Sequence, residues 1–361
     1  MALLWTGIEY FRSEVFILRF PWITPGSGMP PGLLSPWMGT YGVTFLIIFA
    51  AMLLIESKRG GRWCGAAILV LVYLSVTVRS GIEEQPKDAV DVVLVQEEGG
   101  AFKHHLDHCA RVVASVDVFV WPEHSVPYNL MEQERQLPEL QAFLGERDAI
   151  AVVGTRRAAE DEKYASIDSA LRWFNTAAVI SPDQILGFHD KNHPVHFFKD
   201  GIPGANAKSI DTPVGRIGTP ICFDVDYQSV VRQMTLDGAE FILAPTMDQR
   251  NWTEKQHNQH AQLFRHRAAE NGRWIGVSAT SGVTQIIDSA GRSRAQLPLM
   301  KDEVVWGTMY RRVDLTVFTR WGWLIGPVCM WLAPVVVLVI TARRLRNSLA
   351  SRRVTQSKVR R

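Results

Sequence analysis

The chain has 361 residues, 47% of them hydrophobic, and a formal net charge of only +3. The positive charge is concentrated in the segment 343–361, which contains no acidic residue. Such a tail can bind nucleic acid, but beside an apolar span it more simply marks the cytoplasmic side of a membrane. The composition therefore favours a membrane protein with no nucleic-acid partner.

The chain contains four cysteines, Cys64, Cys109, Cys222 and Cys329. Their spacing fits neither a zinc motif nor a dense disulfide framework, so we expect no metal and no cofactor. Three histidines, at 104, 105 and 108, surround Cys109 in a predicted helix. This cluster is either a metal site or one face of a packed or solvated helix, and its loose spacing favours the helix face.

Apolar segments lie near both ends of the chain. Residues 1–20 are interrupted by charged side chains and predict only a weak membrane helix, because charges inside a bilayer are costly. The stronger candidates are 42–55 (extended at its start from Pro36), 63–78 and 321–341. We therefore expect membrane helices in residues 1–81 (about three spans), a transmembrane helix at 321–342 and a basic cytoplasmic tail at 343–361.

Two basic segments predict how these spans are oriented. Short cytoplasmic loops carry an excess of Lys and Arg, so the turn at 58–62 and the tail at 343–361 should both be cytoplasmic. The spans on either side of the central region then each place residues 82–320 outside the cytoplasm.

The central region alternates between runs typical of strands and of helices, which predicts an α/β domain. The runs of strand length are 92–95, 116–121, 150–154, 176–180, 241–244, 274–277 and 283–287. The helical runs are 102–114, 230–236 and 254–270. Asn271-Gly272 is a typical stop for the last of these helices.

Three polar side chains follow predicted strands of this domain. Glu123 follows a strand that Pro122 ends, Lys191 follows the run 185–190, and Cys222 follows a short strand that begins at 214. The carboxyl ends of strands are where α/β enzymes place reacting groups. Taken singly, each residue has a plainer interpretation: a loop or capping glutamate, a solvated loop lysine and a buried core cysteine.

The surrounding motifs make the set more specific. They are Trp121-Pro122-Glu123, Asp190-Lys191-Asn192-His193, Ile221-Cys222-Phe223-Asp224, Gln259-His260 and, upstream, Phe20-Pro21-Trp22. In this order they resemble the nitrilase, or carbon–nitrogen hydrolase, superfamily, and most nearly the bacterial apolipoprotein N-acyltransferases. The likeness covers nearly the whole chain and begins partway through the membrane domain of that family.

The resemblance implies a nitrilase-like αββα sandwich inserted between transmembrane helices. It also implies that Glu123 is the general base, that Cys222 is the nucleophile and that Lys191 stabilises the thiolate and the oxyanion. The implied activity is a membrane-bound N-acyltransferase of the bacterial inner membrane. It would move a fatty acyl group from a phospholipid, through a thioester on Cys222, to the amine of a lipoprotein or related acceptor.

Two alternatives stay open. One is a membrane-tethered amidase that uses water, and the other is a non-catalytic partner subunit of membrane proteins. Because the likeness begins inside the membrane domain of the family, a second membrane protein that supplies further helices is an additional expected partner.

The chain departs from the family pattern beside the expected catalytic residues. Phe223 and Asp224 stand where the family usually has Tyr and Glu, and Lys199 stands at the position of a supporting Glu, with Asp200 next to it. We expect Phe223, Asp224, His193 and Lys199 to support the site or contact substrate. We also expect the catalytic pocket to open toward the membrane, near the loop 193–204 and the aromatic side chains of Trp321 and Trp323.

Overall fold

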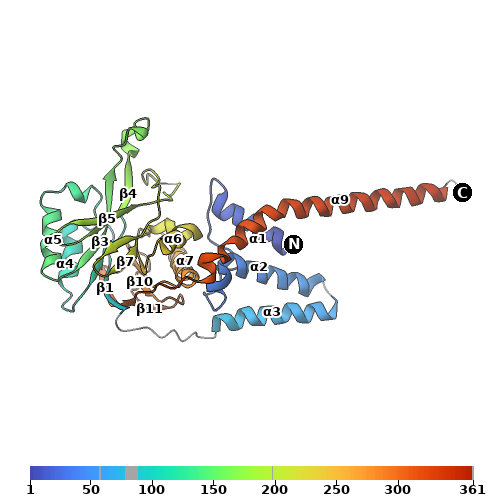
Figure 1. The fold of residues 1–361 in the computed structure, drawn as a ribbon, viewed down its shortest axis with the longest axis horizontal. Coiled ribbons are helices and arrows are strands. Elements are labelled where there is room, and N and C mark those ends of the chain that lie inside the picture. Colours follow the sequence, from blue (N-terminus) through green and yellow to red (C-terminus); the bar gives the residue numbers. More distant parts are fainter. Residues whose placement is uncertain (57, 78–87, 197, 360–361) are drawn as a thin grey trace.

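The computed structural model describes residues 1–56, 58–77, 88–196 and 198–359. It shows an α/β body with helices that project from one side of it (Figure 1). The predicted domain boundary at 81–82 lies outside the described residues.

The projecting part begins with α1 (Ala2–Tyr10), which passes into a π-helical turn (Phe11–Val15). The longer helices are α2 (Ser35–Glu56), α3 (Arg59–Thr77) and α9 (Ile325–Val359). Three helical segments in the described part of the chain are long and apolar enough to cross a membrane: Ser35–Ile55, Arg59–Thr77 and Gly322–Asn347. Residues 1–20 do not form such a span, in line with their charges.

The predicted turn at 58–62 is largely wrong as a structural element. Helix α3 already begins at Arg59, so the basic residues 59 and 62 lie in its first turns. Arg and Lys have good helix propensity, and the following apolar run extends the helix through them.

The first sheet of the α/β body has six strands in the order β12-β1-β2-β3-β4-β5. Their bounds are β1 Ala89–Gln96, β2 Val118–Val120, β3 Ile150–Ala158, β4 Trp173–Ile180, β5 Ile185–Asp190 and β12 Glu303–Tyr310. Strands β1, β2 and β3 are parallel, and the other three pair antiparallel with their neighbours.

The second sheet repeats this plan in the order β11-β10-β9-β8-β7-β6. Its strands are β6 Ile210–Thr212, β7 Gly215–Gly218, β8 Phe241–Thr246, β9 Ile275–Ala279, β10 Gln285–Ile287 and β11 Ser293–Gln296. Its three central strands, β7, β8 and β9, are parallel.

Helices cover the outer face of each sheet. The helices on the first sheet are α4 (Phe102–Ala110) and α5 (Gln136–Gly145), and those on the second are α6 (Gln228–Leu236) and α7 (Glu254–Asn271). One core lies between the sheets, and two more lie under the helix pairs. The result is the expected four-layer αββα sandwich, in which the two sheets face each other and helices cover their outer faces (Figure 1).

The sandwich places three loops at one edge. Glu123 follows β2, Lys191 follows β5 and Cys222 follows β7. Cys222 is also the first residue of a short 3-10 helix, Cys222–Asp226. Helix α7 begins with a capping box made by Thr253 and Gln256 and ends at Gly272, whose φ of 62° makes it a left-handed cap.

Candidate active site

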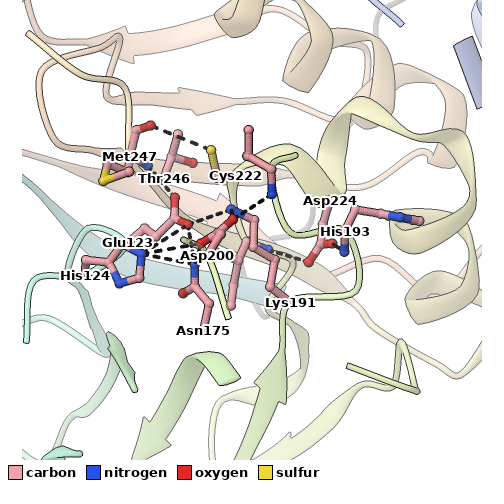
Figure 2. Close-up of polar contacts among 12 residues, drawn as sticks. Glu123, His124, Asn175, Lys191, His193, Asp200, Cys222, Asp224, Thr246 and Met247 are labelled. Carbon is pink, nitrogen blue, oxygen red and sulfur yellow. Dashed lines mark hydrogen bonds and ion pairs between the residues drawn. The ribbon is translucent and has the colours of Figure 1, made fainter. Parts of the chain in front are cut away.

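The three predicted catalytic side chains line one cavity of about 210 Å³ (Figure 2). The residues that line it are Phe20, Trp22, Glu123, Lys191, Val195, Phe198, Asp200, Cys222, Phe223, Met247, Gln249, Trp252, Gln256 and His260. The lining combines the charged side chains of Glu123, Lys191 and Asp200 with several Phe and Trp rings. The cavity is therefore suited to a substrate with one reactive polar group and an apolar portion.

Glu123 is positioned by the backbone of a neighbouring strand. A Cβ on Gly154 of β3 would lie 2.2 Å from the carbonyl oxygen of Pro122, so only glycine admits this loop so close to the sheet. The carboxylate accepts hydrogen bonds from Asn175 Nδ2 at Oε1 (2.6 Å) and from the Met247 backbone N–H at Oε2 (2.8 Å). Both oxygens are thus held in place.

Lys191 is a buried ammonium between two carboxylates. Its Nζ donates to Glu123 Oε1 and to Asp200 Oδ2, both at 2.7 Å, and the residue is only 1% exposed. Burial opposes the charge, but the carboxylates of Glu123 and Asp200 hold the pKa of Lys191 well above its ordinary value. The lysine is therefore a fixed cation in the cavity.

Asp200 shares in the same network. Burial alone would raise its pKa, but Lys191 and a hydrogen bond with His124 hold the pKa of Asp200 below its ordinary value. The Oδ1 atom of Asp200 also accepts from Asn175 Nδ2 at 2.6 Å. Asn175 thus links the carboxylates of Glu123 and Asp200, the two partners of Lys191, to strand β4.

Cys222 adopts a backbone conformation that is unusual for a side-chain-bearing residue. Its φ is 46°, in the left-handed region, and such strain gathers at functional sites. The thiol donates to the carbonyl oxygen of Met247, with a distance of 3.8 Å. Burial, and secondly the charge of Glu123, raises the pKa of Cys222, so the resting sulfur is a thiol that a base must deprotonate.

Asp224 joins the cysteine turn to the lysine loop. Its carboxylate accepts from the backbone N–H groups of Ile221 (3.1 Å) and His193 (2.8 Å), and it lies 2.9 Å from His189 Nε2. Asp224 thus ties the turn at Cys222 to the loop after Lys191 through main-chain hydrogen bonds.

The other predicted supporting residues lie in different surroundings. Phe223 lines the cavity, whereas the ring of His193 packs on Tyr227 at 4.1 Å between centroids. The side chain of Lys199 is exposed, and it is the adjacent Asp200 that contacts Lys191. The loop 193–204 contributes Val195, Phe198 and Asp200 to the cavity, as expected.

The expected role of Trp321 and Trp323 at the cavity is wrong. Neither is among the described residues that line it, and the Trp323 ring packs on the Arg232 guanidinium instead. The aromatic wall comes from Phe20, Trp22, Phe198, Phe223 and Trp252. Trp22 follows the N-terminal helix. It belongs to the motif Phe20-Pro21-Trp22, which by itself does not indicate that Trp22 lines the cavity.

Two groups of donor atoms in the described residues are close enough to hold a metal ion: Cys222, Asp248 and His260, and Glu123, His124 and Asp200. In both groups the charged atoms already pair with neighbouring side chains, so we assign neither group to a metal. The histidines of α4 gather around Glu97, and Cys109 accepts a hydrogen bond from the Trp121 indole in the core. This cluster is a helix face that is packed at His105 and Cys109 and solvated at His104.

The αββα sandwich, with a buried glutamate, lysine and cysteine at one edge, defines a protein of the nitrilase type. A family model described as carbon-nitrogen hydrolase matches residues 95–321. The chain therefore belongs to the carbon–nitrogen hydrolase family. A second model, described as the apolipoprotein N-acyltransferase N-terminal domain, matches residues 1–53.

Known proteins with similar sequences cover both parts of the chain. An apolipoprotein N-acyltransferase of Geobacter metallireducens is 27% identical, over 95% of this chain and 74% of that protein. Another from Azotobacter vinelandii is 25% identical, over 89% of this chain and 69% of that protein. Nit3 of Saccharomyces cerevisiae, a member of branch 10 of the nitrilase superfamily, has the same fold. Its TM-score is 0.51 at 19% identity, over 62% of this chain and 90% of that one.

Proposed function

We propose that the protein is a membrane N-acyltransferase of lipoprotein maturation in the bacterial inner membrane. Its acyl donor would be a phospholipid, and its acceptor would be the amine of a lipoprotein. The relatives named apolipoprotein N-acyltransferase and the match of residues 1–53 to the N-terminal domain of that family support this activity.

The observation that carries the proposal is the loop between the π-helical turn and α2. It places Phe20 and Trp22 in the cavity wall, and it exposes Ile17, Leu18 and Ile23 by 78%, 59% and 75%. Apolar side chains this exposed are typical of a surface that meets lipid. One short segment thus contributes both to the cavity wall and to an exposed apolar surface, which suits a lipid-borne substrate.

The first half-reaction would make the acyl-enzyme. Glu123 takes the thiol proton of Cys222 as the sulfur attacks the ester carbonyl carbon of the donor. The ammonium of Lys191 stabilises the tetrahedral oxyanion. The ester C–O bond then breaks, the lysophospholipid oxygen receives the proton from Glu123, and the acyl group remains on sulfur as a thioester.

The second half-reaction would use the same groups. The acceptor amine attacks the thioester carbonyl, and Glu123 takes the proton that the amine loses. The C–S bond breaks, the amide product leaves, and the proton returns from Glu123 to the sulfur. A cavity wall of aromatic rings limits the access of water, which favours the amine over hydrolysis.

Labelled phospholipid, incubated with the purified protein and a diacylated lipopeptide, tests this proposal. We expect a hydroxylamine-sensitive label on Cys222 and its transfer to the lipopeptide. Cys222→Ala should abolish the label, and Glu123→Gln should slow its appearance by about 10²–10⁴-fold. Release of free fatty acid alone would support a hydrolase instead, and no label at all would support a non-catalytic subunit.

A further inference from the structure

A buried histidine that the acyl-transfer steps above do not use lies in the wall of the cavity. His260, on α7, is 1% exposed and lies between two buried carboxylates. Its Nδ1 is 2.6 Å from Asp248 Oδ1, and its Nε2 is 3.2 Å from Asp226 Oδ1. Burial opposes a charge here, but Asp248 and then Asp226 raise the pKa of His260 to about 10. The ring is therefore an imidazolium at neutral pH.

This imidazolium is close to the nucleophile. A ring nitrogen of His260, a carboxylate oxygen of Asp248 and the Cys222 sulfur all lie within 4.8 Å of one another. The charge of Asp248 disfavours a thiolate at Cys222. The positive charge of His260, within 4.8 Å of the same sulfur, opposes that effect, while Lys191 is already shared by two carboxylates of its own.

His260 also holds main-chain groups that contact the catalytic residues. Asp248 directly follows Met247, whose backbone N–H bonds Glu123 Oε2 and whose carbonyl accepts from the Cys222 thiol. The ion pair with His260 fixes the Asp248 side chain, so it restricts the Met247 backbone as well.

The His260 imidazolium also contacts the N-terminal loop, which lies between the π-helical turn and α2. The Trp22 ring stacks on His260 with 5.4 Å between centroids, and its indole N–H donates to Asp226 Oδ2 at 2.6 Å. His260 thus connects the end of β8, the cysteine turn and the N-terminal loop around one cavity.

We propose that His260 is a positioning residue of the thiol site: held between Asp226 and Asp248, its imidazolium fixes the Met247 main chain against Glu123 and Cys222 and supplies positive charge beside the sulfur. The inference deepens the proposed function, since it rests on Cys222 as the nucleophile, but it concerns the reactivity of the thiol and not the identity of the acyl donor.

The groups that face His260 come from four elements. They are Asp226 and Cys222 from the 3-10 helix, Asp248 after β8, Trp22 from the N-terminal loop, and Phe264 from α7 itself, with Trp252 just before that helix. His257, also on α7, contacts Asp248. Asp226 and Asp248 are the acidic groups among them, so they set the charge of the ring. Removing Asp226 must lower the pKa of His260, because one stabilising anion is lost.

The pH dependence of alkylation at Cys222 tests the proposal. The full-length protein in detergent is treated with iodoacetamide, and modification of the Cys222 peptide is followed by mass spectrometry, which separates it from the exposed Cys64. In His260→Gln we expect the alkylation midpoint to move to higher pH. The rate at pH 7 should then fall about tenfold for each pKa unit of that shift, because the thiolate is the reactive species.

A second variant keeps the test independent of any folding defect in the first. In Asp226→Asn the alkylation profile should gain an inflection between pH 7 and 10, where His260 now loses its proton and its support of the thiolate. The control is His266→Gln, which removes another buried histidine of α7 that lies against the Ser27 carbonyl and away from the cavity. Its profile should match that of the parent protein.

An unchanged midpoint in folded His260→Gln, or the absence of the new inflection in Asp226→Asn, overturns the proposal. If the shifts occur but phospholipid leaves no acyl group on Cys222, the proposed acyl donor is wrong while the role of His260 stands. The two ideas therefore fail separately.

Discussion

Lys191 keeps a counter-ion throughout the proposed cycle because it has two. When Glu123 accepts the thiol proton it becomes neutral, and a lysine paired with Glu123 alone would then be an uncompensated buried charge, which is costly. The Oδ2 atom of Asp200 lies 2.7 Å from the same ammonium, and Asp200 remains ionised. The second carboxylate thus lets Glu123 act as a base without destabilising the lysine.

Asp200→Asn should therefore slow thioester formation more than a substitution at the adjacent Lys199 does. The substitution removes one of the two anions that raise the pKa of Lys191, so the ammonium is less stable when Glu123 is protonated. We expect thioester formation to slow by about tenfold or more, on the scale of one pKa unit. Single-turnover acylation with labelled phospholipid measures this.

Lys199→Ala is the matched comparison, because Lys199 is adjacent in sequence and exposed. Its acylation rate should stay within about twofold of the parent, as surface substitutions have small effects. An equal loss of acylation rate in Asp200→Asn and Lys199→Ala would indicate that Lys199 supports the site.

The polar partners of the site were harder to predict from sequence than the catalytic residues. The motifs around Glu123, Lys191 and Cys222 are local and can be found along the chain. Asn175 lies inside strand β4, and only the pairing of β4 with β3 on one side and with β5 on the other brings it to Glu123 and Asp200. The same holds for Asp226 and His260, which are 34 positions apart and meet only in the folded chain.

At the scale of elements, the position of Glu123 depends on how closely its loop approaches β3. A Cβ on Gly154 would lie 2.6 Å from the Cα of Glu123. Gly154→Ala should thus displace the carboxylate from Lys191 and Met247, and overpacking of this kind costs about 1–3 kcal/mol. We expect acylation to fall by at least about tenfold, measured in single turnovers, together with a lower thermal midpoint.

Gly145→Ala provides the control for that change. Gly145 is in the last turn of α5, and its Cβ would be 3.6 Å from the Pro182 side chain, an ordinary contact. Activity and thermal midpoint should both be retained. An active, fully stable Gly154→Ala protein would contradict the idea that this close approach positions Glu123.

Most central strands can be predicted because they are short apolar runs, such as β1, which is rich in valine, and β8, which is buried throughout. Strand β12 was not predicted, since it is an edge strand with few fully buried positions. Helix α5 was also missed, because Pro138 in its first turn obscures the helical pattern although proline is tolerated there. The predicted helix 102–114 ends earlier, at Ala110.

At the scale of the whole molecule, the basic segments lie far from the α/β body. Figure 1 shows the last turn of α2, the first turn of α3 and the C-terminal part of α9 on the side remote from the sheets. Lys58, Arg59 and Arg62 lie in or directly before the first turns of α3, and Arg343, Arg344 and Arg346 lie along α9. By the positive-inside rule we propose that this remote side is cytoplasmic and that residues 82–320 are extracytoplasmic.

Two variants with one introduced cysteine each test this topology, in a protein whose exposed Cys64 is replaced by Ser and whose three buried cysteines are retained. Val113 is 98% exposed on the α/β body, and Arg346 is exposed on α9 at the end of the candidate span Gly322–Asn347. A membrane-impermeant maleimide added to intact spheroplasts should label Val113→Cys and leave Arg346→Cys unlabelled until the membrane is opened. The reverse pattern would place the catalytic cavity in the cytoplasm. An acceptor that must be reached outside the cytoplasm would then be excluded, because Cys222 lies in the same rigidly packed sandwich as Val113 and the two must share one side of the membrane.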